Sequence, residues 1–167
     1  IPLQGKVTEG KGWVLRNSKG QYTLTLDGLK AGSLERKTPA LEIQGDLTLV
    51  LKKGTESELL SADAALKKGA GTLTIRGEGS LRLQGETALE GEWKEETLNQ
   101  DEPSALRIEG GKLVFTGEET ALYEDTVELA GGEIQIQCLN GKGTGIRAHT
   151  LDDRHFSGSL EMEESEE

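Results

Sequence analysis

A repeating unit of three short strands constrains the fold of this chain more than any other feature. Segment 64–86 (AALKKGAGTLTIRGEGSLRLQGE) contains three apolar stretches in which leucine or isoleucine alternates with other residues. Alternation with a period of two is typical of β-strands, and the glycines between the stretches suit tight turns. No helical stripe fits the segment. It therefore predicts one coil of a β-solenoid.

The same pattern returns along the chain. Each predicted coil opens with a small residue followed by Leu or Ile, and the intervals between these openings are 25, 23, 33 and 24 residues, counted from Ala40, Ala65, Ala88, Ala121 and Gly145. The long interval contains the polar segment 92–103, which we interpret as an inserted loop. After it, LRIEGGKLVF (106–115) matches VELAGGEIQI (127–136) in its apolar pattern and in both glycines. This match indicates the register of neighbouring coils.

The predicted fold is all-β: a parallel β-helix with three short strands per coil and about six coils. Stacking predicts three ladders of inward-facing side chains. The first holds Leu41, Leu66, Leu89, Leu122 and Ile146. The second holds Leu24 or Leu26, Leu49, Leu73 with Ile75, Leu106 with Ile108, Val127 with Leu129, and Phe156. The third holds Leu81 with Leu83, Leu113 with Phe115, Ile134 with Ile136, and Leu160 with Met162, and Leu59 adds a rung. Each rung covers its neighbour, so stability is collective.

We expect residues 1–167 to form a single solenoid domain. Residues 1–12 are predicted to be a lead-in, and residues 163–167 to fray as an acidic tail. Segments 12–17 and 22–28 are expected to form the first coil, with a turn between them and Trp13 over the open end of the core. The single cysteine, Cys138, shares the parity of Ile136 and is expected to face inward.

Composition excludes several functional classes. The net charge is −11, and no Lys/Arg cluster with interleaved aromatic residues occurs, so nucleic acid is not an expected partner. The same charge weighs against a polyanionic sugar chain unless a metal ion bridges the two. No apolar run approaches the ~18 residues that span a bilayer, and no signal peptide is visible. Because the chain opens at Ile1 rather than Met, we expect an upstream region to have been removed.

Several segments resemble a known family: YTLTLDG (22–28), PALEIQGDLTLVL (39–51), LTIRGEGSLRLQG (73–85) and AGGEIQIQ (130–137). They are similar to bacterial carbohydrate-binding-domain proteins from the surface of clostridia and other gut or cellulolytic bacteria. The resemblance implies a right-handed parallel β-helix, an extracellular or cell-surface location, polysaccharide binding and bound calcium.

The chain departs from this family where each coil begins. The family often has Asp-Gly-Ile there, whereas this chain has Pro39, Ala64, Thr87, Thr120 and Thr144 in place of the aspartate. A calcium ion requires six to eight oxygen ligands, several of them charged. These corners therefore lack the carboxylates of the family's calcium sites, and the residues that would hold a metal stay unknown.

The inserted loop is the predicted ligand-binding site, because solenoids place insertions on one face. An exposed Trp93 can stack on a sugar ring, while neighbouring carboxylates and amides bind its hydroxyl groups. The candidate ligand-binding residues are Glu92, Trp93, Asn99, Gln100, Asp101 and Tyr123. The alternative is that Trp93 folds back over the coil, and that Tyr22 and Tyr123 are outward or corner residues without a ligand.

A second polar cluster is RAHTLDDRHF (147–156), with Arg147, His149, Asp152, Asp153, Arg154 and His155. A lyase site held by calcium is one interpretation, and a solvated turn is the other. The histidine spacing matches no zinc signature, and no catalytic triad or phosphate loop occurs. We therefore expect no enzyme. The predicted function is a non-catalytic extracellular or surface module that binds a polysaccharide or cell-wall component. The alternatives are a structural or adhesive solenoid that engages protein partners and, less favoured, a polysaccharide lyase.

Overall fold

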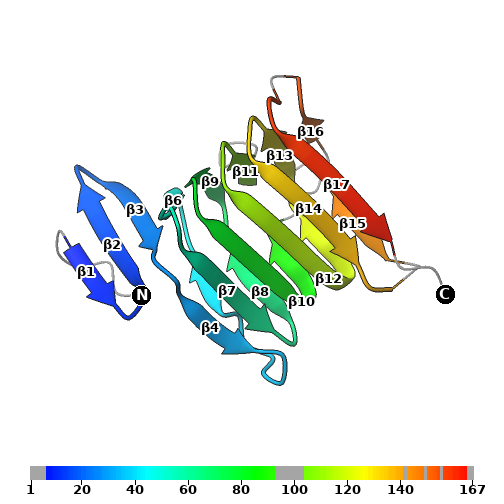
Figure 1. Ribbon diagram of the computed structural model, residues 1–167, viewed down its shortest axis with the longest axis horizontal. Coiled ribbons are helices and arrows are strands. Elements are labelled where there is room, and N and C mark those ends of the chain that lie inside the picture. The colour runs from blue at the N-terminus through cyan, green and yellow to red at the C-terminus, as the bar shows by residue number, and fades with distance from the viewer. Residues whose placement is uncertain (1–6, 93–103, 141–142, 149, 155, 165–167) are drawn as a thin grey trace.

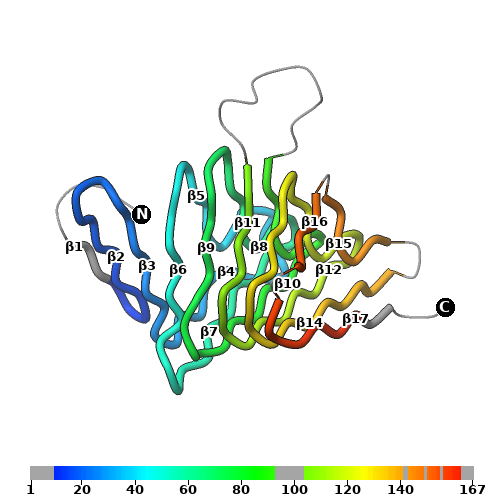
Figure 2. The backbone as a smooth tube through the Cα atoms, turned by 90° about the horizontal axis from the view of Figure 1, so that it is seen from above, coloured from blue at the N-terminus to red at the C-terminus, as the bar shows by residue number. Residues whose placement is uncertain are grey.

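The computed structural model describes residues 7–92, 104–140, 143–148, 150–154 and 156–164. These residues form strands and connecting turns, and the strands stack along one axis (Figures 1 and 2). The stack has three sides, which we call A, B and C. Across the described ranges, no helix has the length and apolar character to cross a bilayer.

Side A is a sheet in which one strand from each turn lies parallel to the next. Its strands are β3 (Gln21–Leu26), β6 (Leu47–Leu51), β9 (Gly71–Gly77), β11 (Ser104–Ile108), β13 (Thr126–Leu129) and β16 (Thr150–Asp152). In β6 and β11 the first, third and fifth side chains are buried and the two between them are half-buried. The inward positions are therefore the apolar ones that the sequence pattern indicated.

Sides B and C share two long strands, β10 (Ser80–Glu90) and β12 (Lys112–Tyr123). The first part of each belongs to side B, with β4 (Lys30–Ser33), β7 (Glu56–Ser61), β14 (Glu133–Cys138) and β17 (Ser159–Glu164). The last residues belong to side C, with β5 (Leu41–Ile43), β8 (Ala64–Lys68) and β15 (Thr144–Arg147). The bends lie at Gly85 and Gly117, where a Cβ would collide with backbone oxygens of Asp63 and Thr120. Only glycine fits such a close approach of two backbone segments.

One turn of the solenoid takes one strand from each side. Strands β3, β4 and β5 form the first turn, and β13, β14 and β15 form the fifth. Strands β16 and β17 begin a sixth turn. The predicted parallel solenoid with three strands per coil is therefore confirmed, with about five turns rather than six.

Two of the three predicted ladders are confirmed rung by rung. On side C, register pairs join Leu41, Leu66, Leu89, Leu122 and Ile146. On side B they join Leu81, Leu113, Ile134 and Leu160 in one row, and Leu59, Leu83, Phe115, Ile136 and Met162 in the next. The rungs between the two ends are buried, so successive turns share one continuous core.

The side A ladder is confirmed except at its end. One row joins Leu24, Leu49, Ile75, Ile108 and Leu129, and the other joins Leu47, Leu73, Leu106, Val127 and Leu151. The prediction for Phe156 was wrong, because Leu151 takes that rung. Phe156 follows β16 and packs half-buried against the core from outside the ladder. Leu151 and Phe156 are both apolar, so the sequence pattern did not show which of the two lies in the last strand of side A.

The prediction of the first coil was also wrong. Strand β2 (Trp13–Ser18) pairs antiparallel with β1 (Val7–Gly10) and with β3, so β2 belongs to a hairpin, and only β3 belongs to the first turn. The turn between them contains Lys19 and Gly20, both with positive φ of 52° and 81°. Two central residues with positive φ define the tight turn of a β-hairpin. The hairpin lies at the N-terminal end of the stack (Figure 1), and Trp13 packs half-buried against the core there.

Two other sequence-based predictions concern single residues. Cys138 is 2% exposed, as predicted for an inward-facing position. Tyr22 was expected to lie outward or at a corner, but it packs against the core. It shares the parity of Leu24 and Leu26, whose side chains face inward.

Candidate functional site

Four of the six predicted ligand-binding residues lie outside the described residues: Trp93, Asn99, Gln100 and Asp101. The other two, Glu92 and Tyr123, lie at the same corner of the solenoid. Tyr123 ends β12, and its carbonyl oxygen accepts a hydrogen bond of 2.6 Å from the Gly91 N–H, directly before Glu92. The structure therefore brings these two residues together, and their role in ligand binding stays a prediction.

The Tyr123 side chain stands in a row of outward-facing residues on side C. Register pairs place Glu42, Lys67, Glu90, Tyr123 and Arg147 side by side on consecutive strands. The Arg147 guanidinium carbon lies 5.7 Å from the centre of the Tyr123 ring, within the range of a cation–π contact. This corner can supply an aromatic ring, a guanidinium and carboxylates to a ligand.

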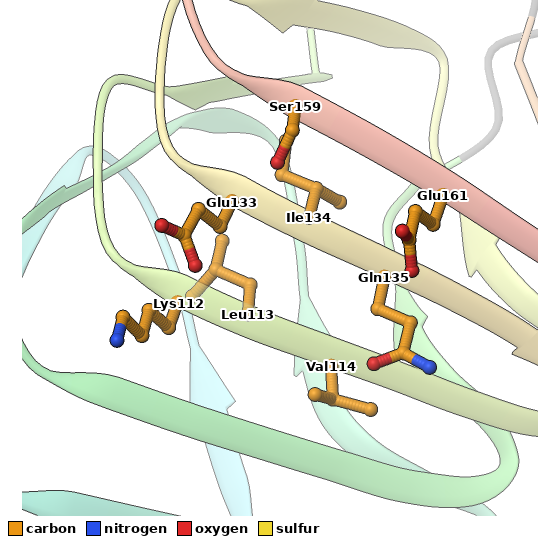
Figure 3. Close-up of a pocket in the computed structure, with 8 residues that line it drawn as sticks. All are labelled: Lys112, Leu113, Val114, Glu133, Ile134, Gln135, Ser159 and Glu161. Atoms are coloured by element: carbon orange, nitrogen blue, oxygen red, sulfur yellow. The ribbon is translucent and has the colours of Figure 1, made fainter.

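An open groove on side B was not predicted from the sequence. Figure 3 shows it across three adjacent parallel strands, β12, β14 and β17. Its volume is about 310 Å³, and its outward-facing lining consists of Lys112, Val114, Glu133, Gln135, Ser159 and Glu161. The buried rungs Leu113 and Ile134 form its floor.

The groove presents hydrogen-bonding groups of several kinds. Lys112 supplies an ammonium, Ser159 a hydroxyl, and Gln135 a carboxamide that extends toward Val114 on the neighbouring strand (Figure 3). Glu133 and Glu161 add carboxylates. Register pairs place Lys112, Glu133 and Ser159 in one row and Val114, Gln135 and Glu161 in the next. Polar groups in rows that repeat at the strand spacing of about 4.8 Å can bind the hydroxyl groups of an extended polymer.

The sequence indicated the outward-facing residues of this groove but not the groove itself. The matched segments 106–115 and 127–136 fixed the register of β12 and β14, and with it the outward positions Lys112, Val114, Glu133 and Gln135. The ligand-binding site was predicted in the loop instead, because the loop contains Trp93. Polar outward residues of a solenoid are common, so the row alone did not indicate a groove.

A smaller cavity lies at the N-terminal end of the stack. Its volume is about 160 Å³, and it lies between β2, β3 and β5 with their apolar residues Leu15, Leu24 and Leu41. Tyr22, Glu42 and Asp46 also line it. The cavity is more apolar than the groove and contains fewer groups that could bind a sugar.

Two members of the cluster that suggested a lyase, Asp152 and Arg154, form an ion pair. The Asp152 carboxylate accepts hydrogen bonds of 3.0 and 2.9 Å from the Arg154 guanidinium, and this contact raises the pKa of Arg154. Arg147 ends β15 on side C, and Asp152 ends β16 on side A. His149 and His155 lie outside the described residues. Within the described ranges, no three metal-ligating side chains come together.

A second guanidinium on side A is held between two carboxylates. Arg107 donates hydrogen bonds of 2.7 Å to Glu109 and 2.6 Å to Glu128, and these contacts raise its pKa. The three side chains are between a third and two-fifths exposed. The charges of Arg107, Glu109 and Glu128 pair with one another. These side chains are therefore less available to a ligand than those of the groove.

Comparison with known proteins gives one match. A family model described as "carbohydrate-binding domain-containing protein" matches residues 2–165, which is nearly the whole chain. No curated protein and no solved structure matches.

Proposed function

Because this chain belongs to the carbohydrate-binding domain-containing protein family, we propose that it is a non-catalytic module that binds a polysaccharide in the groove on side B. The observation that carries this proposal is the open groove, in which an ammonium, a hydroxyl, a carboxamide and two carboxylates lie in register on three parallel strands. We further propose an extracellular or cell-surface location, because a protein that binds plant or cell-wall polysaccharides encounters them outside the cell.

The charge of the chain narrows the expected ligand. With a net charge of −11 and two carboxylates in the groove, the protein repels polyanionic sugar chains. A neutral polysaccharide avoids this repulsion, and its hydroxyl groups can both donate to Glu133 and accept from Lys112. Neutral plant or cell-wall polysaccharides are therefore the ligands to test first.

The test is depletion of the protein from solution by washed, insoluble neutral polysaccharides. The variant Gln135→Ala removes a carboxamide from the middle of the groove. Gln137→Ala is a matched control, because Gln137 lies two residues further along β14 and accepts from the Thr116 hydroxyl at 3.0 Å outside the groove. Loss of one hydrogen bond of about 1.5 kcal/mol weakens binding about tenfold.

We expect Gln135→Ala and Glu133→Ala to weaken binding about tenfold, and Gln137→Ala to leave it unchanged. Equal binding by all variants would place the ligand elsewhere. The variant Tyr123→Ala then tests the corner of side C, where Tyr123, Arg147 and Glu92 lie. Failure of the unmodified protein to bind every neutral polysaccharide would refute the proposed function.

One observation favours a second candidate, a glycoside hydrolase, because Glu133 and Glu161 both line the groove and such enzymes use a pair of carboxylates. Both side chains are exposed, however, whereas a general acid needs surroundings that exclude water. We therefore expect no release of reducing sugar from any polysaccharide that binds. Turnover that is lost on Glu133→Gln would establish the hydrolase instead.

A further inference from the structure

A buried charged pair lies at the corner between sides C and A, away from the groove. Lys68 ends β8, Glu124 follows β12, and both side chains are 0% exposed. The Lys68 Nζ lies 2.8 Å from the Glu124 Oε2. Ser104, the first residue of β11, is also fully buried and lies between them.

The hydrogen bonds at this corner leave one oxygen unsatisfied. Lys68 Nζ donates to Gly71 O at 2.9 Å, Gly69 O at 3.1 Å and Ser104 Oγ at 2.8 Å, which uses its three N–H groups. Glu124 Oε1 accepts from Ser104 Oγ at 2.6 Å and from the Asp125 N–H at 2.8 Å. Oε2 accepts no hydrogen bond in good geometry, although Nζ is close to it. The contact between Nζ and Oε2 is therefore one of charge and proximity.

A buried ion pair of this kind is costly. Both charges have left water, and a carboxylate oxygen without a hydrogen bond adds a further desolvation penalty. Conversion of the pair to an amide removes both charges and the unsatisfied oxygen together. The remaining carbonyl oxygen would be Oε1, which already has two donors.

We propose that Lys68 and Glu124 condense to form an isopeptide bond between Nζ and Cδ, with release of Oε2 as water. One N–H of the ammonium first turns from a backbone carbonyl oxygen to Oε2 and transfers its proton there, which yields a neutral amine and a neutral carboxylic acid. The amine lone pair then forms the N–C bond, and the carbonyl electrons move to Oε1. Transfer of a second proton from nitrogen to Oε2 breaks the C–O bond. A secondary amide and one water molecule result, and nothing is oxidised or reduced.

The surroundings support each part of this step. The Ser104 hydroxyl and the Asp125 N–H point at Oε1, so they can stabilise the negative charge that develops there, as donors of an oxyanion hole do. The reacting groups are held in contact by the fold, which replaces a bimolecular encounter by a positioned one. Exclusion of water from the corner favours loss of water over hydrolysis.

Gly91 completes the corner. A Cβ at this position would collide with the Glu124 carboxyl group, so only glycine leaves that carboxyl in contact with Nζ. The bond would join the second turn of the solenoid to the end of the fourth. A covalent link that spans the third turn would keep three turns together when the stack is unfolded.

The test is the intact mass of the full chain, measured in denaturant. We expect a mass below that of the sequence by one water molecule. Trypsin should then yield residues 68–76 joined to residues 113–142, because the acylated Lys68 resists cleavage. The full mass of the sequence, with separate peptides, would overturn the proposal and leave an ordinary ion pair.

The intact masses of variants distinguish a Lys68–Glu124 isopeptide bond from loss of water at another residue. Lys68→Arg keeps the positive charge but removes the amine, and it should restore the full mass. Lys67→Arg is the matched control, since Lys67 faces outward on the same strand and should keep the loss of water. Ser104→Ala should leave a measurable fraction of uncondensed chain. A loss of water that persists in Lys68→Arg would come from another residue and would also overturn the proposal. Because the first readout uses the unmodified chain, misfolding of a variant does not affect it.

Discussion

The ladder through Phe115 allows a quantitative test of how the solenoid is stabilised. Register pairs join Leu59, Leu83, Phe115, Ile136 and Met162 across consecutive turns. Phe115 lies in the middle and is 0% exposed, whereas Met162 is the last rung and is 50% exposed. Removal of each side chain should therefore have a different effect on the free energy of unfolding.

The magnitudes follow from burial. Phe115→Ala removes a fully buried ring that packs between two turns, and such changes cost about 3–5 kcal/mol. A buried Met→Ala costs about 2–5 kcal/mol, and half exposure of Met162 reduces that to about 1–2 kcal/mol. We expect a difference of about 1–4 kcal/mol between the two variants, with Phe115→Ala the more destabilised.

Urea unfolding followed by far-ultraviolet circular dichroism measures this difference. The m-value should stay the same for both variants, because each unfolds the same stack. Equal losses for Phe115→Ala and Met162→Ala would contradict the reasoning. They would show that the last turn is covered in solution, or that Phe115 does not join neighbouring turns.

Three further predictions concern the backbone, the surface charges and metal. Gly77→Ala should destabilise the protein by at least about 2 kcal/mol, because Gly77 has a φ of 112° and a Cβ would collide with the Leu51 carbonyl oxygen. Gly20→Ala should cost only about 1 kcal/mol, since nothing lies within 4 Å of that Cβ; equal costs would argue against the close packing at Gly77. Arg107→Ala should change the free energy of unfolding only slightly, and the change should shrink with salt; a large, salt-independent loss in urea unfolding would show that the charges are desolvated. Addition of EDTA should shift the thermal midpoint by less than about 1 °C, because the described residues gather no three metal ligands; a larger fall would reveal the calcium that the family resemblance implies.

The sequence was sufficient for most of the solenoid because the repeat carries its own register. Alternation fixes which side chains face inward, and matched segments such as 106–115 and 127–136 fix which residues are neighbours. The rows through Leu66, Leu89 and Leu122 were predicted for this reason.

The errors occurred where the alternation of apolar residues does not distinguish parallel from antiparallel strand pairing. A strand of a hairpin and a strand of a parallel coil have the same period of two, so segment 12–17 looked like part of a coil. Lys19 and Gly20 both have positive φ, which allows the tight turn that joins the two strands of the hairpin. Tyr22 and Phe156 were misplaced at the two ends, where no second turn confirms the register.

The site was harder to predict than the fold. The loop was predicted as the site because it contains an aromatic residue. The groove consists of common polar side chains, which come together only because three strands lie in register. The buried Lys68 and Glu124 were missed because they lie far apart in the sequence. Their meeting depends on how the second and fourth turns stack.

Parallel stacking with one strand per turn on each side is the central claim, and one distance tests it most directly. Side B places Lys30, Glu58, Arg82, Val114, Gln135 and Glu161 in a single outward row. Five steps of about 4.8 Å predict about 24 Å between the Cα atoms of Lys30 and Glu161. Spin labels at these two positions, in a chain with Cys138→Ala, should give one narrow distance distribution near that value by pulsed electron paramagnetic resonance. A broad distribution, or one centred far from it, would contradict the stacked parallel turns.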